Sequence, residues 1–210
     1  MSSSQTENII PLVPINEAKK PLSIPLFQAL FERKSEREYN EDYIIQNSEI
    51  SSILFSAQGI THKTTKKVHD FDRRAVPSAG ALYPLEIYII IDNSSNLAEK
   101  AEKTSIIQNG IYKYDPESHS LLTVISGEGN EKENFQNHMQ MVFNAGLEQG
   151  QIMEASAIMV ICGVYDRAAK KYGKRAKRFS EFFFSFFFSL WHQFFVNVIV
   201  QINIIQIYAN

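Results

Sequence analysis

The segment RRAVPSAGALYP, Arg73 to Pro84, leads into the strand-like run LEIYIII and restricts the possible folds more than any other part of the chain. Pro77 and Pro84 fix the backbone on both sides of Ser78–Ala81, whose side chains are small or absent. A simple hairpin turn needs only about two to five residues, so this longer segment calls for another explanation. Two interpretations remain open. Either a flat ring lies against the loop backbone, or the small residues only avoid clashes at a tight crossover into the strand.

Helical and strand-like patterns are mixed along the chain, which indicates an α+β or α/β domain. Branched and aromatic residues dominate two runs that are typical of buried strands. Asn47 or Ser48 caps the second helix, and Gly59 ends it. The predicted helices cover residues 25–38, 48–58 and 130–150, and the predicted strands cover 85–91, 155–165 and a hairpin over 110–126.

Composition excludes several classes of protein. The chain has 210 residues, enough for one domain, and its 21 basic side chains balance 23 acidic ones, so we expect no nucleic-acid surface. Cys162 is the only cysteine, and its apolar neighbours favour a buried structural role over a nucleophilic one. The histidines are scattered without metal-ligand spacing, so we expect no metal site. Neither a phosphate-binding glycine loop nor a G-x-S-x-G elbow is present.

The pentapeptide RKSER ends the first predicted helix and is a candidate phosphate site. Arg33 and Arg37 are four residues apart and share a helix face, where two guanidinium groups can bind phosphate oxygens. Ser35 adds a hydroxyl donor, and Lys34 adds a positive charge. The alternative is an ordinary solvated helix end, in which the neighbouring glutamates neutralise the arginines.

The segment KKYGKR is a second candidate for chemistry. Lys171 and Tyr172 are both able to give or accept protons when burial and neighbouring charges change their pKa values. The alternative for this segment is a basic surface loop with no role in catalysis.

Five segments in this order resemble the SagB-type dehydrogenases of the nitroreductase superfamily. They are RKSEREY, LFSAQGIT, RRAVPSAGALYPLEIYII, GIYKYDPESHSL and VYDRAAKKYGKRAKRF. The resemblance covers residues 21–178. PSAGALYP followed by a strand is specific to that group, whereas RxSxR is shared more widely across the superfamily.

This resemblance implies an α+β, nitroreductase-like fold with a central mixed sheet flanked by helices, and an oxidoreductase that uses FMN. It also implies a homodimer with FMN at the interface. Relatives of this type oxidise peptide azolines to azoles, which suggests a modified-peptide or small-molecule substrate and a cyclodehydratase partner; a generic nitro or quinone reductase is the alternative. The implied FMN-binding residues are Arg33, Lys34, Ser35, Arg37, Pro77, Ser78, Ala79 and Gly80, and the implied catalytic residues are Lys171 and Tyr172.

The segment from Phe182 to Asn210 contains no Lys, Arg, Asp or Glu and departs from the family pattern. Relatives continue with a helix of the form L-E-A-G-H-x-x-Q-N, whereas RAKRFSEFFFSFFFSLWHQ stands here. We expect that the reading frame is lost shortly after Arg178 or Phe179, so that the C-terminal part of the fold is missing or replaced. Codons rich in A and T would give the Phe, Ile, Asn and Gln that dominate this tail.

The sequence thus predicts a mobile polar arm over residues 1–20, an incomplete FMN domain over 21–178 and an aberrant tail over 179–210. The arm lacks the basic flank and long apolar core of an export signal, so we expect a cytoplasmic protein. Two alternatives remain. A tail-anchored, non-catalytic membrane protein would use the apolar tail as a span, although its many amide groups disfavour lipid. A binding module would hold flavin or peptide without turnover.

Overall fold

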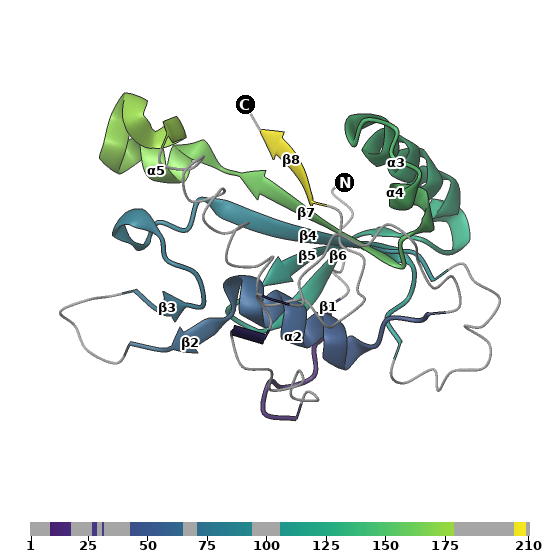
Figure 1. Cartoon of the computed structure of the whole chain (residues 1–210), viewed down its shortest axis with the longest axis horizontal. Helices are drawn as coiled ribbons and strands as arrows, with labels where there is room; N and C mark the ends of the chain where they lie inside the picture. The colour runs from purple at the N-terminus through teal and green to yellow at the C-terminus, as the bar shows by residue number, and fades with distance from the viewer. Residues whose placement is uncertain are drawn as a thin grey trace, which may run out of the picture.

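The structure is a computed structural model that describes residues 9–17, 27–28, 31, 43–64, 71–93, 106–178 and 204–208 (Figure 1). Its centre is a six-stranded sheet in the order β1-β6-β5-β4-β7-β8. The sheet strands are β1 (Ile9–Pro11), β4 (Leu85–Ile91), β5 (Gly110–Asp115), β6 (Ser120–Ser126), β7 (Ala157–Gly163) and β8 (Ile204–Tyr208). A separate two-stranded ribbon consists of β2 (Ile60–His62) and β3 (Arg73–Arg74). The helices are α2 (Asn47–Gln58), α3 (Lys132–Ala145), α4 (Gln151–Glu154) and α5 (Tyr165–Tyr172), with 3-10 turns at η1 (Ala79–Ala81), η2 (Gly129–Glu131) and η3 (Gly173–Arg175).

The strand β4 lies inside the sheet and pairs antiparallel with β5 on one side and with β7 on the other. The pairing of β7 with β8 is parallel, so the sheet is mixed. Helix α2 lies on one side of the sheet, and α3 and α4 lie on the other (Figure 1). The prediction of an α+β domain with a central mixed sheet flanked by helices is confirmed.

Side chains alternate along β4 and enter two separate cores. Ile87, Ile89 and Ile91 belong to the larger core, which also contains the apolar side chains of α2. Ile90 packs in the second core with Phe135 and Met139 of α3. Burying each large aliphatic side chain contributes roughly 1.5–3 kcal/mol, and a slip of one residue would exchange the two faces. This alternation therefore fixes the register of the strand that follows the proline-bounded loop.

The strand and hairpin predictions are confirmed: β4 spans residues 85–91, β5 and β6 lie within 110–126, and β7 lies within 155–165. The hairpin turn is closed by Asp115, whose carboxylate accepts the backbone N–H groups of Glu117 (3.2 Å) and Ser118 (3.2 Å). The helix predicted over 130–150 is shorter than expected, since α3 ends at Ala145 and α4 begins after a turn.

Helix α2 begins at Asn47, and its N-cap is Gln46, one residue before the caps that the sequence suggests. The reason is local: Glu49 Oε2 accepts the backbone N–H of Gln46 (2.9 Å), which sets the first turn. The expected stop at Gly59 is confirmed, and its N–H donates to Phe55 O (2.7 Å). The helix predicted over 25–38 lies outside the described residues, apart from positions 27–28 and 31, which are helical.

Part of the predicted N-terminal arm belongs to the sheet. Strand β1 pairs antiparallel with β6, from Ile9 opposite Leu122 to Pro11 opposite Ser120. Leu12 is only 5% exposed and lies in the larger core. The sequence predicted no secondary structure for this arm because its composition is polar. Backbone pairing with β6 and the burial of Leu12 nevertheless hold residues 9–12 in place.

The charge-free tail contributes one strand that was not predicted. Residues of β8 pair in parallel with β7, from Ile204 opposite Met159 to Tyr208 opposite Gly163. Positions 179–203 lie outside the described residues, as do 209–210. Within the described part of the chain, no helix is both long and apolar enough to cross a membrane.

Candidate active site

The loop between Ser78 and Pro84 has a strained backbone immediately before β4. Gly80 adopts φ 63° and ψ 18°, and the non-glycine residues Ala81 and Tyr83 also have positive φ, 54° and 42°. Left-handed angles cost a residue with a Cβ about 1–2 kcal/mol, and such strain is concentrated at functional sites. Ser78 Oγ accepts the backbone N–H of Tyr83 (2.9 Å), which closes the loop.

Gly80 is the point where this loop meets the end of α5. A Cβ atom at this position would lie 2.7 Å from Lys171 Nζ and 3.0 Å from the Tyr172 hydroxyl oxygen. Lys171 is exposed and Tyr172 is half-buried, with Lys171 Nζ 5.8 Å from the Tyr172 ring centre. Two motifs that the sequence singles out separately are therefore neighbours in space.

The loop and α5 are joined by hydrogen bonds at the start of the helix. Val164 N–H donates to Pro84 O (2.7 Å), and Arg167 Nη1 donates to Tyr83 O (3.2 Å). Lys171 and Tyr172 form the last turn of α5 rather than a surface loop, and Gly173 ends the helix with φ 54°. Since both ends of the helix contact the loop, the position of Lys171 depends on the loop conformation.

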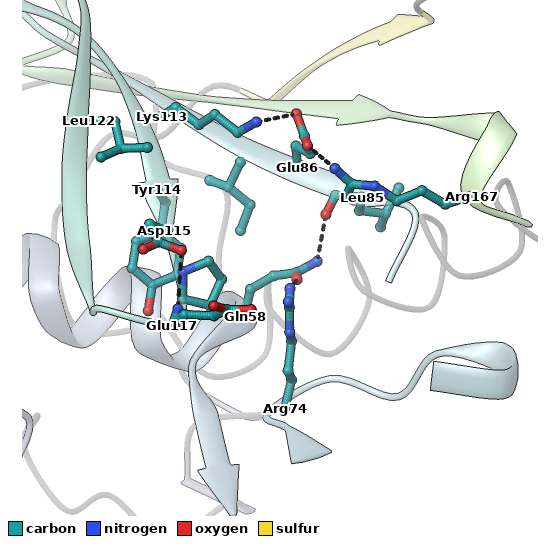
Figure 2. Close-up of a pocket in the computed structure, with 12 residues that line it drawn as sticks. Gln58, Arg74, Leu85, Glu86, Lys113, Tyr114, Asp115, Glu117, Leu122 and Arg167 are labelled. Atoms are coloured by element: carbon teal, nitrogen blue, oxygen red, sulfur yellow. Dashed lines mark hydrogen bonds and ion pairs between the residues drawn. The ribbon is translucent and has the colours of Figure 1, made fainter. Parts of the chain in front are cut away.

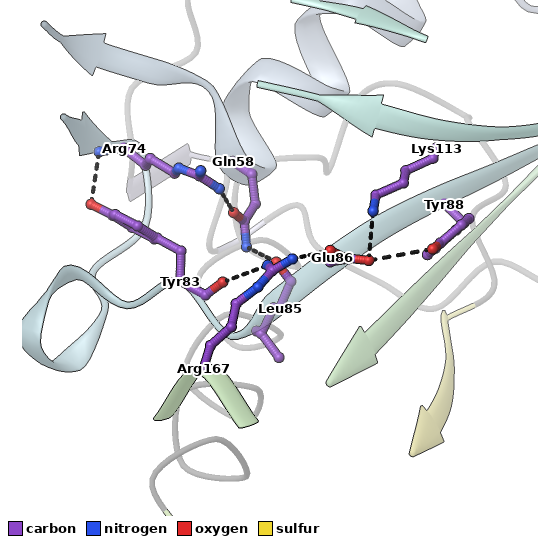
Figure 3. Close-up of polar contacts among 8 residues, drawn as sticks. All are labelled: Gln58, Arg74, Tyr83, Leu85, Glu86, Tyr88, Lys113 and Arg167. Atoms are coloured by element: carbon purple, nitrogen blue, oxygen red, sulfur yellow. Dashed lines mark hydrogen bonds and ion pairs between the residues drawn. The ribbon is translucent and has the colours of Figure 1, made fainter. Parts of the chain in front are cut away.

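A polar network beneath the loop connects α2, β3 and β4. Arg74 Nη1 donates to Gln58 Oε1 (2.7 Å), and Gln58 Nε2 donates to Leu85 O (3.3 Å) (Figure 2). The Arg74 guanidinium also lies over the Tyr83 ring, 4.3 Å from its centre (Figure 3). The Tyr83 hydroxyl in turn donates to Asp72 O (3.1 Å) and accepts the Arg74 backbone N–H (3.2 Å). These contacts hold the loop from below.

Glu86, the second residue of β4, lies between two cations. Its carboxylate pairs with Lys113 Nζ (2.9 Å) and with the Arg167 guanidinium, and the Tyr88 hydroxyl donates to it (3.3 Å) (Figure 3). Burial alone would raise the pKa of Glu86, but hydrogen bonds and charge from Lys113 and Arg167 outweigh burial and lower it. Burial and the nearby Glu86 charge raise the pKa of Tyr88 to about 12. Glu86 therefore stays ionised and helps to fix α5 through Arg167.

The sequence reasoning missed this supporting network, whose members are Gln58, Arg74, Tyr83, Glu86, Lys113 and Arg167. Two of these residues could have been identified from the sequence, because Arg74 and Glu86 flank the proline-bounded loop within the run RRAVPSAGALYPLE. Lys113 and Arg167 could not be identified in this way, because their roles depend on how β5 and α5 lie relative to β4 in the folded chain.

The family to which this chain belongs follows from its similarity to known proteins. The sequence pattern of the nitroreductase family matches residues 30–186. The chain belongs to the nitroreductase family. It is 34% identical over 157 residues to a protein of Methanocaldococcus jannaschii named "Putative nitroreductase MJ1384". That match covers 74% of this chain and 65% of the relative, so the chain spans less than two thirds of the length of that relative.

Solved structures share the nitroreductase-family fold at low identity. A structure described as a nitroreductase from Ralstonia eutropha has a TM-score of 0.56 at 17% identity, over 91% of this chain and 73% of that one. A second structure described as a nitroreductase, from Anabaena variabilis, has a TM-score of 0.51 at 21% identity, over 85% of this chain and 28% of that one. A chain of the Escherichia coli microcin synthetase McbBCD complex, with truncated pro-MccB17 bound, has a TM-score of 0.51 at 20% identity, over 89% of this chain and 72% of that one.

Nitroreductase-family proteins generally use flavin, and the described part of the loop fits a flat ring system. The loop residues from Ala79 to Ala81 carry at most a methyl group, and Gly80 has no side chain where a Cβ would meet Lys171. Gly80 is itself exposed, so a ring can approach the loop backbone next to Lys171 Nζ and the Tyr172 hydroxyl. Pro77 is exposed, and Ser78 and Ala79 are half-buried, so the start of the loop is also accessible.

The remaining predicted FMN-binding residues lie outside the described part of the chain. They are Arg33, Lys34, Ser35 and Arg37. Within the described residues, no group of three or more His, Cys, Asp and Glu side chains is arranged to hold a metal ion. Cys162, on β7, is half-buried, and burial raises the pKa of its thiol, which disfavours the reactive thiolate.

Proposed function

We propose that this nitroreductase-family protein is an FMN-dependent oxidoreductase that oxidises azoline rings in a modified peptide to azoles. The observation that supports the proposal is the closeness of Gly80 to Lys171 Nζ and to the Tyr172 hydroxyl, two groups of a kind that can exchange protons. Formation of an azole removes a hydride and a proton from the azoline ring. Bound FMN supplies the hydride acceptor.

The chain's own side chains divide the remaining work. Arg33, Ser35 and Arg37 hold the FMN phosphate, and Lys34 adds positive charge, as the resemblance to SagB-type dehydrogenases implies. Residues from Pro77 to Gly80 give the ring a flat backbone surface. Lys171 takes the proton from the substrate carbon, and the Tyr172 hydroxyl passes it toward solvent.

A generic nitro or quinone reductase is the second candidate. The name of the M. jannaschii relative favours it, whereas the fold shared with a subunit of the microcin synthetase complex favours azoline oxidation. The same resemblance supports two further proposals, a homodimer and a cyclodehydratase as partner. Incubation of the FMN-loaded protein with an azoline peptide, and separately with a nitroaromatic compound and a quinone, distinguishes the two activities.

Substitution of the two proposed catalytic residues tests their role. We expect Lys171→Ala to reduce azoline oxidation by roughly 10²–10⁴-fold, because it removes the group that takes the proton. Tyr172→Phe should cause a smaller loss, because only the proton relay is removed. Turnover is measured by mass spectrometry as the loss of two hydrogens from the peptide.

The matched control is Lys170→Ala, which removes an exposed lysine of the same helix next to the site and should leave turnover unchanged. If Lys171→Ala and Tyr172→Phe both bind FMN and keep full turnover, these residues do not catalyse the reaction.

A further inference from the structure

A cavity of about 240 Å³ lies where β4 and β5 separate (Figure 2). The pairing of β4 with β7 continues to Leu85 opposite Gly163, but its pairing with β5 stops at Tyr88 opposite Lys113. The first residues of β4 therefore face the end of β5 across an open space. A single buried water needs only about 10–15 Å³, so this space admits a small organic molecule.

The wall of the cavity combines apolar and charged side chains. Leu85, Ile87 and Leu122 supply aliphatic surface. The cations are Arg74, Lys113 and Arg167, and Lys113 and Arg167 share the carboxylate of Glu86.

Arg74 is the cation whose charge is left without such a partner. Its guanidinium donates to the neutral Gln58 amide and lies over the Tyr83 ring, and among the described residues it forms no ion pair. Asp115 and Glu117 also line the cavity and act on Arg74 through their charge, but neither forms an ion pair with it: Asp115 accepts the N–H groups of its own turn, and Glu117 is exposed. No carboxylate in the described part of the chain touches this half-buried guanidinium, and the more distant acids offset the cost of its burial only in part, since burial still lowers the pKa of Arg74. An anionic ligand would remove that cost.

We propose that this cavity binds a small carboxylic acid with a short hydrocarbon body, its carboxylate on Arg74 and its chain against Leu85, Ile87 and Leu122. A guanidinium fork matches the two oxygens of a carboxylate, and the Tyr83 ring and Gln58 fix the plane of that fork. The aliphatic wall favours such an acid over phosphate or sulfate. The site is separate from the contact of Gly80 with Lys171, and neither FMN nor the proposed oxidation is needed for it.

Butyrate is a suitable probe, with butyramide as its uncharged analogue. Saturation-transfer NMR with the full chain, without added FMN, measures the affinity for each. We expect butyrate to bind and butyramide to bind at least about tenfold more weakly, because the lost carboxylate removes charge-assisted hydrogen bonds to Arg74.

Three variants locate the site. Arg74→Gln should weaken butyrate binding about tenfold or more. Arg73→Gln removes the same charge from the neighbouring, exposed position of β3 and should leave affinity unchanged. Glu86→Gln should increase affinity, because it frees Lys113 and Arg167 from their internal carboxylate.

Several results would overturn this site: no binding of butyrate to the wild-type chain, equal binding of butyramide, or equal losses in Arg73→Gln and Arg74→Gln. Should Arg74→Gln fail to fold, Arg74→Lys keeps the charge and loses the fork, and unchanged affinity in that variant would also contradict the proposal. Weaker butyrate binding in Glu86→Gln would contradict it independently.

Discussion

The absence of a side chain at Gly80 allows the loop before β4 to lie against the end of α5. We expect Gly80→Ala to reduce stability by about 1–2 kcal/mol, since φ 63° is unfavourable for a residue with a Cβ. The new methyl group would also lie 2.7 Å from Lys171 Nζ and displace that flexible side chain. Turnover should therefore fall by more than the loss of folded protein explains. Denaturant unfolding and turnover, measured on the same preparations, give both quantities.

Gly129 provides the matched control for this substitution. It also has a left-handed backbone, φ 60°, but a Cβ there would meet nothing within 4 Å. Gly129→Ala should lose a similar amount of stability and keep its turnover per folded molecule. Equal turnover losses in the two variants would show that backbone strain alone, and not the contact with Lys171, explains the effect of Gly80→Ala.

At the scale of elements, His119 connects the hairpin turn to α2 and to the segment after β1. Its Nε2 lies 2.8 Å from Ser51 Oγ, its Nδ1 lies 2.9 Å from the Tyr114 hydroxyl, and Ser51 Oγ donates to Val13 O (2.6 Å). The Ser51 hydrogen is used on Val13, so a neutral ring with its hydrogen on Nε2 satisfies every partner. Burial lowers the pKa of His119 below its ordinary value of 6.5, and the nearby Val13 backbone acts in the opposite direction without outweighing burial.

This lowered pKa predicts a loss of stability in mild acid. Below about pH 6.5 the unfolded chain binds a proton at this histidine more readily than the folded chain does, so the free energy of unfolding falls. The loss should continue until the pH reaches the lowered pKa of the folded state, and no contribution is expected above about pH 7.5. Because the ring is only half-buried, we expect a total effect below about 1 kcal/mol.

Denaturant unfolding between pH 7.5 and 5 measures this dependence. His119→Gln should flatten the pH dependence. Identical slopes in the wild type and His119→Gln would assign the pH dependence to other groups.

The sequence predicted the elements that local patterns determine. The runs of branched and aromatic residues predicted β4 and β7, and the hairpin over 110–126 was predicted as well, because these patterns depend on residues close together in the sequence. It did not predict β1, whose place depends on β6 as a partner. The contact between Gly80 and Lys171 was implied only by family resemblance, since no local pattern brings the loop and α5 together.

The match to the nitroreductase family covers residues 30–186 and ends within the charge-free tail, so most of the tail lies beyond the family pattern. We propose that the reading frame changes after Arg178 or Phe179, as the run of Phe, Ile, Asn and Gln suggests. Resequencing of the gene and its transcript tests this proposal, and we expect a shifted frame that encodes the family's helix. A confirmed in-frame transcript across the whole tail would contradict it.

A visible absorption spectrum tests whether the loop from Pro77 to Gly80 and the end of α5 form one face of an FMN site. The full chain is mixed with FMN, desalted and measured. Flavin absorption bands that remain with the protein, and that weaken in an Arg33→Gln, Arg37→Gln double variant, are the predicted result. A folded protein that retains no flavin would contradict the claim.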